Sequence, residues 1–158
     1  MYDLVIIQCV KSKIWDRNKT APRFVPTKDA YISPYFKKMR AFAEKHGKRW
    51  GVLSGKYGFL LPDTKIENYD TSFAHSSYVS STSEPISLDE IKEKLRTDKK
   101  LRNGLDLDKI TTCVVLGGDA YMKVVKESFS EYQVEVIDPL KGLSFGEKLK
   151  WLDEGCKR

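Results

Sequence analysis

Four short segments combine lysine, serine or glycine with polar neighbours directly after an apolar run, where a strand would end. They are residues 8–13, 54–58, 117–119 and 138–142. Lysine ammonium groups, hydroxyls and the backbone amides that glycine exposes bind phosphates and polar heterocycles. Ligands of open α/β sheets bind outside the carboxyl ends of the strands. The four segments therefore predict one polar binding site along a sheet edge.

Two of these segments depend on glycine, and each has a simpler interpretation. The sequence from Ser54 to Gly58 is also compatible with a plain tight turn, and it lacks the Walker-loop pattern. Gly117 and Gly118 would either bind an anion at a helix N-terminus or only let a helix pack closely on the sheet.

Cys9 follows the first part of the first apolar run, and Lys11 and Lys13 come two and four residues after it. A cysteine in this position is most often a small buried apolar side chain. Nearby ammonium groups would raise its thiolate fraction, so nucleophilic use remains the alternative.

Two further segments are candidates, and in the second an aromatic ring is paired with a carboxylate. Asp29 and Tyr31 precede the first long helical pattern, and Tyr69 directly precedes Asp70. An aromatic face stacks on a base and a carboxylate orients water, which are the groups that nucleobase chemistry needs. The simpler interpretations are a helix-terminal charge for Asp29 and an ordinary loop for Tyr69 and Asp70.

The composition argues against a metal or disulfide framework. Three cysteines are widely spaced, and neither of the two histidines lies near a cysteine. We therefore expect no metal and no cofactor, with chemistry carried by Asp, Glu, Lys, Tyr, Ser or Cys. No apolar run approaches the roughly 20 residues of a membrane span, and no signal-peptide pattern is present. We expect a soluble cytoplasmic protein, without a membrane partner and monomeric.

The elements that must position these residues follow from the apolar pattern. Unbroken apolar runs predict four strands, within residues 4–10, 50–53, 110–116 and 134–137. Helical patterns lie between them: residues 35–43, a capped helix from Ser87 through Leu101, residues 121–129, and a second capped helix after Ser144. This alternation predicts a mainly parallel four-stranded sheet in a single three-layer α/β/α domain spanning residues 1–158. The serine-rich residues 72–87 predict an irregular loop.

The charge is unevenly distributed along the chain. The net charge is +6, but residues 1–56 carry 13 lysines and arginines against 4 acidic residues. Such asymmetry is typical of nucleic-acid contact, although a basic face without a partner is the simpler alternative. The expected contacts to the DNA backbone are Arg17, Lys19 and Arg23.

The motifs occur in an order that resembles a known family. Cys-x-Lys-x-Lys, Asp-Ala-Tyr-x-Ser, Leu-Ser-Gly-Lys-Tyr-Gly-x-Leu-x-Pro, Asn-Tyr-Asp and Gly-Gly-x-x-Tyr follow one another along nearly the whole chain. They resemble a bacterial and phage family related to the YaaA peroxide-stress proteins and to the catalytic domain of archaeosine synthase. The wider fold is similar to that of uracil-DNA glycosylases, and to small Brig-type glycosylases that strip modified bases from phage DNA. The chain lacks the His-Pro-Ser and Gly-x-Asp-Pro-Tyr motifs of uracil excision.

This resemblance implies a uracil-DNA-glycosylase-like fold and a DNA glycosylase that flips and excises a modified base, in antiviral defence. Asp70, or else Asp29, would stabilise the oxocarbenium-like sugar, while Lys11 and the amides near Gly117 would stabilise the leaving base. Tyr31, Tyr57 or Tyr69 would stack on that base. The other expected substrate contacts are Cys9, Lys13, Ser54, Lys56, Gly117 and Gly118. The alternatives are a non-enzymatic DNA-binding stress protein and a transferase that uses Cys9 on a modified base.

Overall fold

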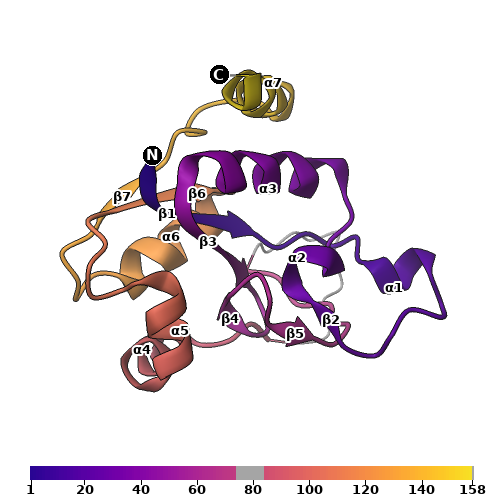
Figure 1. Ribbon diagram of the computed structural model, residues 1–158, viewed down its shortest axis with the longest axis horizontal. Coiled ribbons are helices and arrows are strands. Elements are labelled where there is room, and N and C mark those ends of the chain that lie inside the picture. The colour runs from indigo at the N-terminus through magenta and orange to yellow at the C-terminus, as the bar shows by residue number, and fades with distance from the viewer. Residues whose placement is uncertain (74–83, 158) are drawn as a thin grey trace.

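The computed structural model describes residues 1–73 and 84–157 and has a mixed α/β architecture (Figure 1). A five-stranded sheet of order β4-β3-β1-β6-β7 lies at its centre. Its strands are β1 (Tyr2–Gln8), β3 (Gly47–Ser54), β4 (Gly58–Leu60), β6 (Thr112–Leu116) and β7 (Glu135–Ile137). β1 pairs in parallel with β3 and β6, and β6 pairs in parallel with β7. The prediction of a mostly parallel central sheet is confirmed.

The sheet has five strands where four were predicted, because the chain turns back after β3. β4 pairs antiparallel with β3, with Ser54 opposite Gly58. Gly58 has a φ of +76°, a conformation that glycine adopts without strain. A run of three residues is too short to show a strand pattern, so the sequence indicated only the turn. A separate two-stranded sheet joins β2 (Val25–Pro26) to β5 (Lys65–Ile66).

Helices cover both faces of the central sheet. Figure 1 shows α3 (Pro34–His46) and α7 (Phe145–Lys157) on one side, and α4 (Leu88–Thr97), α5 (Lys99–Leu105) and α6 (Asp119–Ser128) on the other. Two short helices, α1 (Ile14–Arg17) and α2 (Thr27–Ala30), lie beside β2. Among the residues described, no helix combines the length and apolar character that crossing a bilayer requires.

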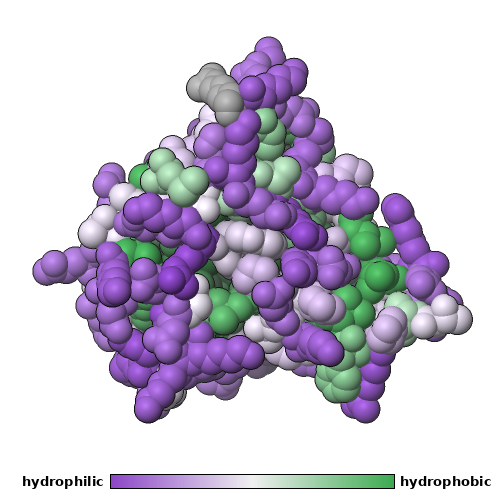
Figure 2. All heavy atoms as spheres, in the orientation of Figure 1, coloured by the Kyte–Doolittle hydropathy of each residue, from purple (hydrophilic) through white to green (hydrophobic). Residues whose placement is uncertain are grey.

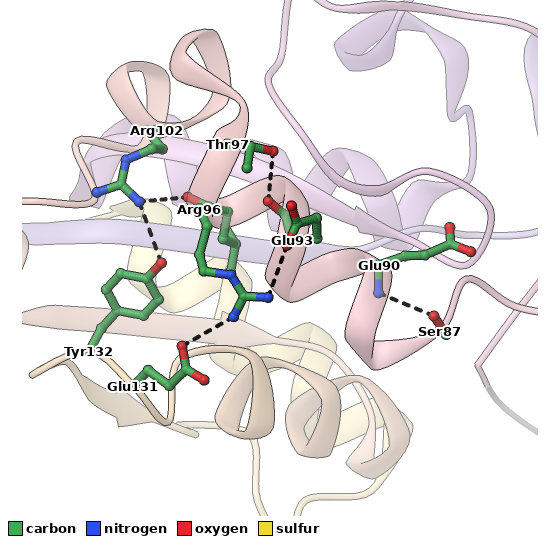
Figure 3. A network of polar contacts seen from close by, with 9 residues as sticks. Ser87, Glu90, Glu93, Arg96, Thr97, Arg102, Glu131 and Tyr132 are labelled. Atoms are coloured by element: carbon green, nitrogen blue, oxygen red, sulfur yellow. Dashed lines mark hydrogen bonds and ion pairs between the residues drawn. The ribbon is translucent and has the colours of Figure 1, made fainter.

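Capping side chains begin the helices where the sequence indicated. The Ser144 hydroxyl accepts a hydrogen bond from the Glu147 amide, and the Glu147 carboxylate accepts one from the Ser144 amide. This reciprocal pair confirms the predicted capping box of α7. The Ser87 hydroxyl likewise accepts from the Glu90 amide at the start of α4 (Figure 3).

The helix predicted from Ser87 through Leu101 is in fact two helices. α4 ends at Thr97, and the Asp98 carboxylate accepts a hydrogen bond from the Leu101 amide, which begins α5. Asp98 therefore caps a new helix, an effect that apolar spacing alone does not reveal. Arg96 holds this corner to the rest of the fold through an ion pair with Glu131, drawn in Figure 3.

The core is centred on β1. Residues 4–7 of this strand are fully buried, because β3 and β6 lie on either side and helices cover both faces. The buried positions of α3 are Phe36, Met39, Phe42 and Ala43, of which Phe42 packs against Trp151 of α7. This burial explains why the first apolar run is unbroken rather than alternating.

Candidate functional site

The strand order places the topological switch point of the sheet, where ligands of open α/β sheets bind, at the carboxyl ends of β1 and β6. After β1 the chain adds β3 and β4 on one side of that strand, and it later adds β6 and β7 on the other side. The direction in which strands are added therefore reverses between β1 and β6. Gln8 spans this point, since its side-chain oxygen accepts a hydrogen bond from the Gly118 amide at 2.7 Å. The Cys9 amide donates to the Leu53 carbonyl on the other side, at 3.1 Å.

The structure therefore brings together three of the four predicted segments, residues 8–13, 54–58 and 117–119. The fourth, residues 138–142, follows β7 at the outer edge of the sheet. There the Asp138 carboxylate accepts from the Leu140 amide within a turn.

A cluster of buried tyrosines lies near Cys9, at the end of β1. The hydroxyls of Tyr31 and Tyr69 lie 2.5 Å apart in a hydrogen bond, and the two rings meet edge-on. The Lys13 ammonium lies 4.4 Å from the centre of the Tyr69 ring and 5.9 Å from that of Tyr31. Only 3% of Lys13 is exposed, and its amine donates to the Lys11 carbonyl. We call Lys13, Tyr31 and Tyr69 the lysine–tyrosine cluster.

A second polar chain begins at the cysteine. The Cys9 sulfur lies 3.2 Å from the Tyr121 hydroxyl, which lies 3.1 Å from the hydroxyl of Ser72. Tyr121 belongs to the first turns of α6, directly after Gly117 and Gly118. The apolar pattern of residues 121–129 predicted only a buried helix face for Tyr121, although the spacing Gly-Gly-x-x-Tyr includes it.

Burial sets the electrostatics of these groups. Desolvation lowers the pKa of Lys13, while the neighbouring Cys9, Asp16 and Asp70 act in the opposite direction. Desolvation also raises the pKa of Tyr31, Tyr69 and Tyr121. The phenols are therefore neutral hydrogen-bond donors and acceptors at physiological pH.

Asp70 lies at the rim, between two cavities. The first, of about 270 Å³, is lined by Lys11, Asp16, Asn68, Tyr69 and Asp70. The second, of about 580 Å³, is bordered by Tyr69 and Asp70 and by Lys56 and Thr71, with residues 84–87 and 90. These volumes are of the order of small-molecule sites, roughly 300–1,000 Å³. Tyr69 and Asp70 form the wall that the cavities share.

The turn between β3 and β4 positions this wall. A side-chain carbon on Gly55 would lie 2.4 Å from the Thr71 carbonyl oxygen, so only glycine permits this close approach. The buried Ser54 hydroxyl accepts from the Lys56 and Tyr57 amides and fixes the turn. The ring of Tyr57 then meets Tyr69 edge-on, with 5.5 Å between their centres.

Some predicted residues lie elsewhere or serve the core. Asp29 sits on α2, half exposed, and pairs with Arg40 of α3 at 3.5 Å. It is not among the described residues that line the two cavities beside Asp70. The Tyr31 ring is buried against Phe36, with 4.9 Å between centres, which leaves Tyr69 better placed to meet a ligand.

The predicted DNA-backbone residues are on the surface around α1 and β2. Arg17, Lys19 and Arg23 are exposed. Arg23 also forms an ion pair with Glu67 at 2.9 Å. Lys56 is exposed on the β3–β4 turn, with its ammonium 5.1 Å from the centre of the Tyr57 ring.

Residues 4–154 match the model of a family of unknown function, DUF6884. The chain belongs to this family. It is also 32% identical, over 134 residues, to the uncharacterized protein YfjM of Bacillus subtilis strain 168, an alignment that spans 84% of this chain and 81% of that protein. No solved structure matches the chain. The family match includes every site residue named above, and its description assigns no activity.

Among the described residues, no group of three or more His, Cys, Asp or Glu side chains could hold a metal ion. The chemistry that the site offers is that of a carboxylate, two lysines, neutral phenols and a thiol.

Proposed function

We propose that this protein is a DNA glycosylase that flips a modified base out of DNA and hydrolyses its N-glycosidic bond. The observation that carries the proposal is that Asp70, Lys11 and Tyr69 line one cavity at the sheet's carboxyl edge. Cleavage of a glycosidic bond develops positive charge on the sugar and negative charge on the leaving base. A carboxylate and an ammonium group on one cavity match these two charges.

Each residue of the rim then has a role in the reaction. The Asp70 carboxylate faces the sugar, stabilises its oxocarbenium character and orients the water that attacks C1′. The bonding electrons of the glycosidic bond leave with the base, and Lys11 stabilises that anion. The proton that the attacking water loses passes to the Asp70 carboxylate and then to the released base, which leaves neutral. Tyr69 provides the aromatic wall, and its buried hydrogen bond to Tyr31 holds it in place.

The fold and the charge distribution support the same proposal. Helices on both faces of a mostly parallel sheet suit a three-layer, uracil-DNA-glycosylase-like arrangement. The exposed basic residues Arg17 and Lys19 lie on or next to α1, whose Asp16 lines the Asp70 cavity. We propose DNA as the partner, with modified phage DNA as the substrate and defence in the cytoplasm as the setting.

Product analysis distinguishes this proposal from its alternatives. Purified protein is incubated with genomic DNAs that carry different base modifications, and released bases are identified by mass spectrometry. A free modified base, released by wild type and lost with Asp70→Asn, supports the glycosylase. Retention of DNA in a mobility shift without release would instead support a DNA-binding stress protein. A covalent adduct on Cys9, absent from Cys9→Ser, would support the transferase.

A further inference from the structure

Phe24 is an exposed aromatic side chain for which the fold provides no cover. Its exposed fraction is 49%, and in the described part of the chain the other large apolar residues with such exposure are Met1 and Phe145. Met1 is the chain terminus, and the Phe145 ring packs edge-on against Tyr35. Phe24 is instead accompanied by a cation, with the Arg23 guanidinium 5.2 Å from the centre of its ring.

The loop that presents Phe24 is held in place on both sides. The Trp15 indole donates to the Pro22 carbonyl at 2.8 Å, and Asn18 accepts from the Thr20 amide at 3.0 Å. On the other side, Val25 pairs with Ile66 in the two-stranded sheet. An aromatic ring on a pre-organised loop loses little conformational entropy when it binds, which favours a role in recognition.

This loop is attached directly to the rim of the candidate site. Arg23 is joined to Glu67 by their ion pair, and Glu67 stands three residues before Asp70. On the adjacent helix α1, Asp16 lines the same cavity as Asp70. The ion pair and the short connection from Glu67 to Asp70 therefore link the loop of Phe24 to the segment that carries Asp70.

The surroundings of Phe24 are basic. The exposed cations on this part of the surface are Arg17, Lys19, Arg23 and Lys65. The nearby carboxylates have partners within the protein: Asp16 accepts from the Lys13 amide, Glu67 pairs with Arg23, and Asp63 pairs with Lys28. Figure 2 shows apolar side chains among hydrophilic ones at the end of the molecule where Figure 1 places α1 and β2. An apolar side chain among cations fits duplex DNA, whose phosphates bind the cations and whose base stack accepts the ring.

We propose that Phe24 inserts into the base stack of duplex DNA beside the flipped nucleotide and fills the space that the extruded base leaves. This inference rests on the proposed function, because it assumes that the Asp70 site receives a nucleotide flipped out of duplex DNA. The exposed cations around the loop would hold the phosphates on either side. Because single-stranded DNA has no duplex stack to fill, Phe24 is expected to act only on duplex substrates.

The first measurement is base release from matched duplex and single-stranded substrates. Removal of the inserted aromatic ring is expected to reduce the duplex activity of Phe24→Ala by about 10-fold or more, which corresponds to about 1.4 kcal/mol. Activity on the single strand should stay within about 2-fold of wild type, and Phe24→Leu should keep an intermediate duplex activity. Phe145→Ala is the matched control, because it removes a still more exposed ring from α7.

The second measurement does not depend on catalysis. A 2-aminopurine probe beside the modified base reports unstacking by a rise in fluorescence when the protein binds. The rise is expected with wild type and Phe145→Ala, and it should be absent with Phe24→Ala at saturating protein. A rise without base release would contradict the glycosylase but support insertion of Phe24. A wild-type protein that leaves the fluorescence unchanged, or a Phe24→Ala variant that matches wild type in both assays, would overturn the inference.

Discussion

Lys13 is the residue whose placement is hardest to explain by folding alone. Its ammonium is buried against two aromatic rings, where desolvation lowers the pKa from its usual 10.5. Burial of a charged amine opposes folding, so an apolar side chain of similar length would serve the core better. Its contact with Tyr69 and its proximity to Asp70 give it a place in the site instead.

Lys13→Met tests this interpretation by separating stability from activity. Methionine fills similar volume without charge, so we expect the variant to be more stable by about 1 kcal/mol or more, yet strongly impaired in base release. Between the lowered pKa of Lys13 and 10.5, the unfolded protein binds more protons than the folded one, so stability of wild type rises with pH there. Thermal unfolding across this window should show that rise in wild type and lack it in Lys13→Met. A variant that is destabilised but fully active would contradict the assignment.

At the residue scale, local sequence motifs indicated several side chains that the structure brings together. Cys9, Lys13 and Ser54 were named from strand ends and Tyr69 from a loop, and Cys9 and Lys13 lie close to the Tyr31–Tyr69 pair. Tyr121 was missed because a buried helix position looks the same in sequence whether its hydroxyl bonds to a cysteine or not. The ion pair of Asp29 with Arg40 also could not be predicted from the sequence, because it depends on how α2 packs beside α3.

At the scale of elements, the β3–β4 turn acts as the support of the Asp70 segment. Gly55→Ala would place a carbon 2.4 Å from the Thr71 carbonyl oxygen, so one of the two segments must move. We expect base release to fall by at least about 10-fold, because displacement of about 1 Å in a site commonly costs that much or more. Gly146→Ala is a matched control, since a carbon there would meet no neighbour within 4 Å. Equal activity of Gly55→Ala and wild type would show that the turn does not position the site.

Asp3 joins β1 to the chain that enters β6. Its carboxylate accepts hydrogen bonds from the Thr111 amide and hydroxyl and from the Thr112 amide, which lower its pKa from 3.8 to about 2. A lowered carboxyl pKa stabilises the fold above pH 3.8, and this stabilisation is lost as the pH falls through about 2.

Asp3→Asn should therefore be less stable than wild type at neutral pH, and the difference should shrink between pH 4 and pH 2. Chemical denaturation at several pH values measures this directly. A difference that stays constant across the acid range would show that the charge of Asp3 contributes nothing.

Long apolar patterns in the sequence predicted the main helices and the parallel strands. They did not predict the short strand β4 or the capped boundary between α4 and α5. β4 has three residues and owes its existence to the turn at Gly58. The break between α4 and α5 depends on one capping carboxylate, that of Asp98. Such features are decided by single hydrogen bonds or a single φ angle, which periodicity does not report. The predicted loop at residues 72–87 lies largely outside the described residues.

For the whole molecule, the uneven charge predicts how DNA binding responds to salt. Each phosphate contact removed should lower the slope of log affinity against log salt by roughly 0.9 for duplex DNA. The double variant Arg17→Glu/Lys19→Glu should therefore bind all DNA sequences more weakly, with a smaller slope. Lys99→Glu/Lys109→Glu is the control, since both lysines are exposed but lie outside the basic N-terminal third. Weaker binding by the control pair alone would place the DNA footprint elsewhere.

The site contains no described cluster that would hold a metal, so we expect full activity with excess EDTA. Activity that is lost with chelation and restored by a divalent ion would contradict a mechanism built on Asp70 and Lys11.

The most direct test of the whole account is single-turnover base release by Asp70→Asn. This substitution keeps the shape of the side chain and removes its charge. It therefore removes the electrostatic stabilisation of the sugar cation without changing the volume of the cavity. We expect the rate of release to fall at least about 100-fold, which corresponds to about 2.7 kcal/mol in the barrier, with DNA affinity unchanged or slightly raised. Asp29→Asn is the control, because the wild-type Asp29 carboxylate pairs with Arg40. This variant should release base at nearly the wild-type rate. Release by Asp70→Asn within a few-fold of wild type would contradict the account.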